Sequence, residues 1–158
     1  MMSATLNPHP RDAAIPAIIN GVINGAIAYA GHKDRAAVPL TVDAISSTEA
    51  TVGSEAAMIA LALAVILTCI TAVLFGKGPA ARDPQAAGIP IFPRVLWIAL
   101  QNALMLFGAT VVAAVLWQRA FGTVMVPPAA AAILVAFFAA AVTVVVDIRT
   151  KRALLREP

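Results

Sequence analysis

Charged side chains are scarce in this sequence. Of its 158 residues, 12% are charged and 61% are apolar, whereas soluble domains carry about 25% charged and roughly 45–50% apolar residues. A soluble domain of this size must cover most of its surface with polar groups, and eleven basic and eight acidic side chains are too few for that. The composition therefore excludes an ordinary soluble domain and indicates a surface that largely faces lipid.

Residue types that bind metals or catalyse reactions are also sparse. Cys69 is the only cysteine, and neither His9 nor His32 has a partner at the spacing of a zinc site. The carboxylates are scattered, and no nucleophile lies beside a base. The basic residues flank apolar stretches instead of clustering with aromatic residues. We therefore expect no enzyme, no metal or other cofactor and no nucleic-acid partner.

Four long stretches contain no Asp, Glu, Lys, Arg or His: residues 13–31, 56–75, 95–116 and 126–146. At 1.5 Å rise per residue, each helix would be about 30 Å long, which matches the hydrocarbon core of a bilayer. A membrane β-barrel would need alternating polar and apolar residues, and these runs do not alternate. The sequence predicts an all-α, integral membrane four-helix transmembrane bundle that forms one domain over residues 1–158.

Helix-ending and helix-starting residues lie close to the limits of these runs. Ser54 and Glu55 are typical of the N-cap and first turn of a helix, and they indicate the start of the second span. Pro93 precedes the third span, and Pro127 and Pro128 suit the first turn of the fourth.

The distribution of Lys and Arg predicts the orientation of the spans. Eight of these residues lie in the N-terminal tail, loop 76–94 and the C-terminal tail, and three lie in the other two loops. An excess of basic residues marks the cytoplasmic side. We expect an N-in/C-in topology in a bacterial inner membrane, with loop 32–55 extracytoplasmic and loop 76–94 cytoplasmic. Alternatively, Ala28–Ala30 resembles a signal-peptide cleavage site, and cleavage there would leave three spans in the same orientation.

Four residues are candidate anchors at the two membrane interfaces. Trp97 and Trp117 lie twenty residues apart at the two ends of the third span, a separation of about 30 Å along a helix. Asp147 and Arg149 follow the fourth span and can pair with charged neighbours or with lipid headgroups.

The first span contains a motif that is typical of close helix packing. Asn20, Gly21, Asn24 and Gly25 recur at a spacing of four residues, so that two glycines and two amides share one side of the helix. The fourth span has a matching stripe of small residues: Ala132, Ala136 and Ala140. We expect a helix-packing face here.

Polar residues of the other spans fall at a similar depth. In the expected topology, Gln101 and Asn102 lie near the level of Asn20, and Thr68 lies near the same level. We expect a polar layer that joins the helices by hydrogen bonds. The alternative interpretation is a binding cavity lined by Asn20, Asn24, Gln101 and Asn102.

Loop 32–55 contains a short segment of alternating residues. Val38, Leu40 and Val42 alternate with other residues, which indicates a short strand or a piece that lies at the membrane interface.

The absence of charges within the four spans bears on function. Ion-coupled carriers usually have charged residues within the membrane, and these spans have none. We expect an accessory or structural subunit of a membrane complex, with lipid and either a membrane protein or a second copy as partner. The alternative is a small transporter or pore for a neutral solute, formed by one chain or by an oligomer.

Overall fold

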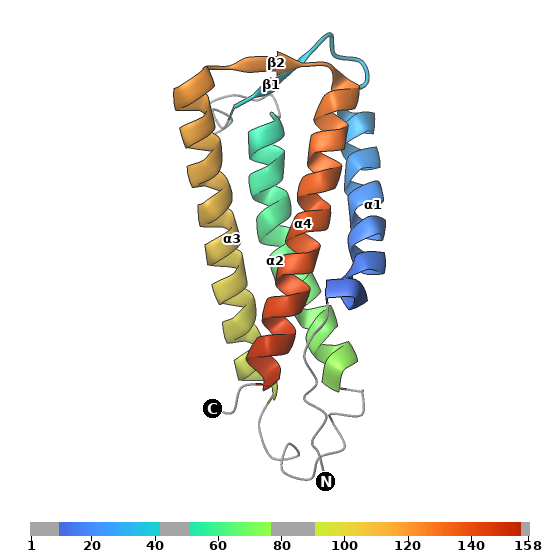
Figure 1. Ribbon diagram of the computed structural model, residues 1–158, viewed down its shortest axis with the longest axis vertical. Helices are drawn as coiled ribbons and strands as arrows, with labels where there is room; N and C mark the ends of the chain where they lie inside the picture. Colours follow the sequence, from blue (N-terminus) through green and yellow to red (C-terminus); the bar gives the residue numbers. More distant parts are fainter. Residues whose placement is uncertain (1–9, 42–50, 77–90, 156–158) are drawn as a thin grey trace.

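The computed structural model describes residues 10–41, 51–76 and 91–155, and four long helices dominate it (Figure 1). They are α1 (Ala14–His32), α2 (Val52–Gly76), α3 (Ile91–Phe121) and α4 (Pro128–Leu155), and a short 3-10 helix, η1 (Pro10–Ala13), precedes α1. Each of the four is long and apolar enough to cross a membrane. The predicted set of four apolar helices is therefore confirmed.

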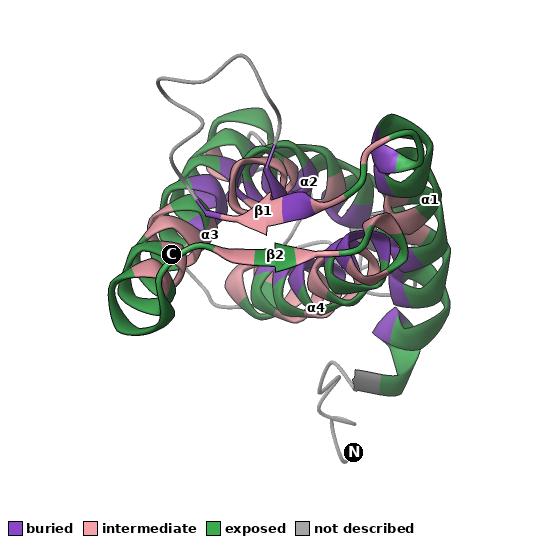
Figure 2. Cartoon of the chain, turned by 90° about the horizontal axis from the view of Figure 1, so that it is seen from above, coloured by how far each residue is buried: buried purple, intermediate pink, exposed green. Residues whose placement is uncertain are grey.

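The helices form a row in which α4 and α2 occupy the middle. α4 packs against both α1 and α2, and α3 packs mainly against α2. Consequently α1 and α3 are the outer helices, and their outward sides are exposed (Figure 2). Exposed apolar side chains line these outer surfaces, among them Ile18 and Val22 on α1 and Leu96 and Leu104 on α3.

A two-stranded ribbon crosses one end of the row. β1 (Val38–Leu40) pairs antiparallel with β2 (Val124–Val126), with Pro39 opposite Met125. The ribbon joins the segment between α1 and α2 to the segment between α3 and α4 (Figure 1). The structure therefore has a strand within the alternating segment of the loop. It also places residue 126, the expected start of the fourth helix, in a second strand.

The interior is built mainly from small side chains, which lets the helix backbones approach closely. Many of the buried residues are alanines: Ala17, Ala28, Ala60, Ala64, Ala99, Ala103, Ala131 and Ala139. Two clusters of buried residues surround α4, one containing Val135 near the ribbon and one containing Val142 and Val146. α4 is thus the helix around which the core is assembled.

The start of α2 is fixed by a pair of hydroxyl groups. The backbone N–H of Ser54 donates to Oγ1 of Thr51 (3.2 Å), and the backbone N–H of Thr51 donates to Oγ of Ser54 (3.0 Å). This reciprocal arrangement is a capping box. Thr51 is therefore the N-cap, and the interpretation of Ser54 as the N-cap is wrong, because Ser54 occupies the third position of the helix.

The third and fourth helices extend beyond the charge-free runs. α3 begins at Ile91, so Pro93 falls inside its first turn, where a backbone N–H has no partner within the helix. α3 ends where Gly122 adopts φ 71° and its N–H donates to the carbonyl of Gln118 (2.8 Å), the usual geometry of a helix C-terminus. α4 continues to Leu155, well past Asp147.

Candidate functional site

Gly21 and Gly25, two of the three glycines of α1, lie directly against α4. A Cβ atom added to Gly21 would be 2.9 Å from the carbonyl oxygen of Ala136 and 3.3 Å from Cβ of Ala140. A Cβ atom added to Gly25 would be 2.8 Å from Cβ of Ala136. Real Cβ atoms are almost never found below 3.0 Å, so the two backbones meet at a distance that only glycine permits at these positions.

The two asparagines of α1 form hydrogen bonds next to this contact. Nδ2 of Asn20 donates to Oγ1 of Thr143 on α4 (3.3 Å), and Nδ2 of Asn24 donates to the carbonyl of Asn20 (2.8 Å). Both asparagines are half-buried. Asn20 thus links α1 to α4, whereas the bond of Asn24 stays within α1.

Asn102 is the centre of a polar cluster between α2, α3 and α4. Its side chain is buried, and Nδ2 donates to Oγ1 of Thr68 (3.0 Å) and to Oγ1 of Thr150 (3.3 Å). Its Oδ1 accepts a hydrogen bond from Nε of Arg149 (3.1 Å), and Thr68 donates to the carbonyl of Ala64 (2.6 Å). One amide therefore uses both of its N–H donors and its oxygen to hold three helices together.

Gln101, the neighbour of Asn102, lies apart from this cluster. Its side chain is exposed, because consecutive helical residues point about 100° apart. Asn20 and Asn102 bond to Thr143 and Thr150, which are two turns apart on α4. The four amides considered as the lining of a cavity therefore do not form one hydrogen-bonded set among the described residues.

The carboxylate of Asp147 is paired on two sides. Oδ2 accepts from Nζ of Lys151 one turn further along α4 (2.7 Å), and Oδ1 accepts from Oγ1 of Thr71 on α2 (3.3 Å). Arg94 of α3 donates to the carbonyl of Ala153 on α4 (2.9 Å). These contacts tie α2 and α3 to the last two turns of α4.

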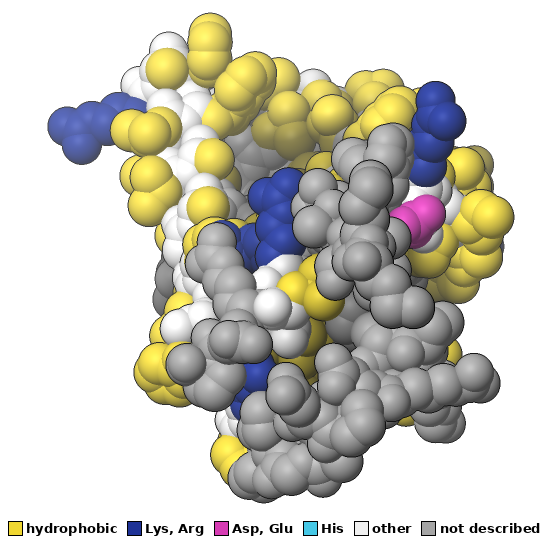
Figure 3. Space-filling model, turned by 60° about the horizontal axis from the view of Figure 1, so that its bottom comes forward, with side chains coloured by type: hydrophobic (Ala, Val, Ile, Leu, Met, Phe, Trp, Pro, Cys, Tyr) yellow, Lys and Arg dark blue, Asp and Glu magenta, His cyan; other side chains and the backbone are white. Residues whose placement is uncertain are grey.

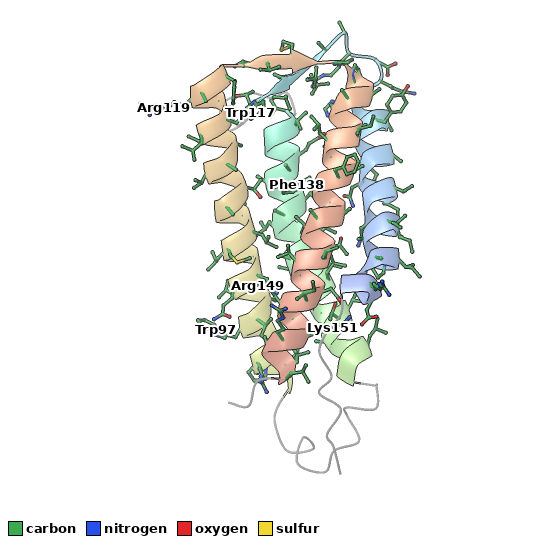
Figure 4. All side chains as sticks on the ribbon, in the orientation of Figure 1. Trp97, Trp117, Arg119, Phe138, Arg149 and Lys151 are labelled. Atoms are coloured by element: carbon green, nitrogen blue, oxygen red, sulfur yellow. The ribbon has the colours of Figure 1, made fainter. Side chains whose placement is uncertain are left out.

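The candidate interface anchors lie at the two ends of the bundle. Trp97, Arg149 and Lys151 are near the end opposite the ribbon, and Trp117 and Arg119 are near the ribbon (Figure 4). Both tryptophans are exposed, and the ring of Trp117 lies 4.4 Å from that of Phe121. Several Lys and Arg side chains gather at the end opposite the ribbon, while hydrophobic side chains cover the flanks (Figure 3).

His32 has no partner at a metal-site spacing in the sequence, but the structure places it beside Glu55. Nε2 of His32 lies 2.9 Å from Oε1 of Glu55, and the imidazole is almost fully buried. The pair is close enough for charge interaction, but its geometry is not that of an aligned hydrogen bond, and Nδ1 of His32 and Oε2 of Glu55 are buried without a partner among the described residues. The two residues are distant in sequence, so no spacing rule could have paired them.

No family model, curated protein or solved structure matches this chain. Its chemistry must therefore be inferred from the described side chains alone. Within residues 10–41, 51–76 and 91–155, no group of three or more His, Cys, Asp or Glu residues could hold a metal ion. The polar groups described above are amides, hydroxyls and paired charges, and their observed contacts hold helices to one another.

Proposed function

We propose that the chain is a multi-pass protein of a bacterial inner membrane with both termini in the cytoplasm. The four apolar helices support the membrane location. The orientation is supported by the Lys and Arg side chains at the end opposite the ribbon, since basic residues favour the cytoplasmic side. Trp97 and Trp117 near the two ends fit the two lipid interfaces.

We further propose that the protein is an accessory or structural subunit of a membrane complex. The observation that carries this proposal is that the buried amide of Asn102 is fully engaged with Thr68, Thr150 and Arg149. A solute site would need such groups free to bind the solute. In contrast, the outer sides of α1 and α3 are apolar and face away from the row, where the helices of a partner can pack against them.

Extraction in a mild detergent, followed by mass spectrometry of the purified material, tests this function. A subunit is expected to co-purify with another membrane protein at a fixed ratio, or to purify as an oligomer with a fixed number of copies. Reconstitution into liposomes tests the alternative function of transport. Neutral solutes of graded size are enclosed in the vesicles, and their release is measured. Solute release that changes in Asn20→Leu or Asn102→Leu while assembly stays intact would show a transport pathway and contradict the structural role.

The orientation is tested separately by labelling single cysteines in intact cells. In a Cys69→Ser background, a cysteine at Met125 in the ribbon is expected to react with a membrane-impermeant maleimide added outside the cytoplasmic membrane. A cysteine at Arg152 near the end of α4 is expected to react only after the membrane is opened. The reverse pattern would refute the N-in/C-in topology.

A further inference from the structure

Gln101 presents an amide on the outer surface of α3. It is exposed, and none of the hydrogen bonds among the described residues involves its side chain. It lies one turn beyond Trp97 toward the middle of α3, which is about 6 Å deeper along the helix axis. In the proposed membrane location, an amide there faces hydrocarbon, where an unpaired polar group is unfavourable. The side chain therefore needs a partner that residues 10–41, 51–76 and 91–155 do not supply.

The surroundings of Gln101 form a continuous strip along α3, here called the α3 seam. At 100° per residue its members fall within an arc of about 80°, and they are Trp97, Gln101, Leu104, Gly108, Val112 and Val115. Trp97 and Leu104 are 60% and 65% exposed. A Cβ atom added to Gly108 would meet nothing within 4 Å, so no side chain covers the helix backbone there. A strip of this kind lets another helix backbone approach closely.

We propose that the α3 seam binds the α3 seam of a second copy of this chain, in a parallel dimer in which the two Gln101 amides hydrogen-bond to each other. The inference rests on the membrane location given under Proposed function. Two copies inserted in the same orientation present Gln101 at the same depth. A primary amide is both donor and acceptor, so it is its own complement across a two-fold axis. A polar residue at one level of an apolar helix contact also fixes its register.

Oxidative cross-linking of single cysteines in native membranes tests the dimer. In the Cys69→Ser background, which removes the exposed native thiol, Leu104→Cys and Gly108→Cys are expected to form disulfide-linked dimers. Ala109→Cys is the matched control, because Ala109 is an exposed residue next to Gly108 that points about 100° away from Gly108 and about 140° away from Leu104. Cross-linking from the two seam positions that does not exceed that from Ala109→Cys would overturn the proposal.

The role of the amide is tested by replacing it in the Leu104→Cys protein. Loss of the two amide hydrogen bonds in Gln101→Leu is expected to weaken dimerisation about eightfold, measured by dilution in lipid bilayers. Gln101→Asn keeps an amide and is expected to retain more of the affinity. Equal dimerisation of the Leu104→Cys protein with and without Gln101→Leu would refute the amide contact.

The same cross-linking experiment separates this inference from the proposed function. A disulfide between Leu104→Cys and a different membrane protein would overturn the second copy as partner but leave the chain a subunit of a complex. A monomer that neither cross-links nor co-purifies with a partner, and that releases solute from liposomes, would overturn both.

Discussion

Adding one methyl group to Gly21 or Gly25 of α1 is expected to push α1 away from α4. In Gly25→Ala, the new Cβ would be 2.8 Å from Cβ of Ala136, whereas carbon atoms in contact lie about 3.5–4.0 Å apart. The helices must therefore separate locally by roughly 1 Å. Overpacking of this kind costs about 1–3 kcal/mol, and the better helix propensity of alanine returns up to about 1 kcal/mol. We expect a net loss of about 1–2 kcal/mol.

The control for this substitution lies on the same helix. A Cβ atom added to Gly31 meets nothing within 4 Å, so Gly31→Ala gains helix propensity without a clash. Its free energy of unfolding is expected to equal or exceed that of the wild type, and to exceed that of Gly25→Ala by about 2 kcal/mol. The free energies are measured by denaturant titration in detergent micelles with far-UV circular dichroism.

A second substitution in α4 distinguishes the two glycines. Ala136→Gly removes the atom that Gly25→Ala would strike, so the double variant is expected to show a favourable coupling energy of about 1 kcal/mol. The atom nearest to a Cβ at Gly21 is the carbonyl oxygen of Ala136, which glycine retains. Ala136→Gly is therefore expected not to rescue Gly21→Ala. Equal stability of Gly25→Ala and Gly31→Ala, or equal rescue at Gly21 and Gly25, would refute the proposed packing.

Three further pairs of substitutions test the polar contacts. Asn102→Leu loses three hydrogen bonds and is expected to lower the free energy of unfolding by about 2 kcal/mol, against about 0.5 kcal/mol for Asn20→Leu, which loses one; a reversed order would contradict the geometry. Thr51→Ala is expected to lose about 1 kcal/mol and to speed hydrogen exchange in the first turn of α2, whereas Thr51→Ser keeps the cap. Lys151→Met is expected to destabilise the protein more than Asp147→Asn in the same titration, because it leaves a half-buried carboxylate without its cation, while a lysine left alone can extend to water. Equal losses in the last pair would contradict the extra cost expected for the unpaired carboxylate.

The existence of the four helices could be predicted from the sequence, but their ends could not. The charge-free runs mark where side chains suit hydrocarbon, whereas a helix ends where its backbone hydrogen bonds end. α4 therefore continues through Asp147 and Arg149, because charged side chains end a charge-free run without interrupting the backbone hydrogen bonds of a helix. At the start of α2, the cap is a threonine whose role depends on a hydroxyl three residues later, and Thr51 lies before the charge-free run 56–75.

The contacts between helices could be predicted only in part, because the sequence does not show which helices are neighbours. Sequence spacing identified the face with Gly21 and Gly25, but it could not show that α4 covers this face. Gln101 and Asn102 were indistinguishable as adjacent amides, and only the position of α2 and α4 determines that one is buried and the other exposed. The pairing of β1 with β2, like that of His32 with Glu55, joins segments whose separation leaves no local signal.

The position of α4 in the middle of the row has a consequence for biosynthesis. A ribosome makes α1 first and α4 last, yet the surface that fits Gly21 and Gly25 belongs to α4. Until α4 has been made, α1 lacks the neighbour to which it is fitted, and α2 lacks one of its two main neighbours. A nascent chain that stops before residue 128 would therefore leave the face with Gly21 and Gly25 uncovered and would expose surface that the four-helix chain buries.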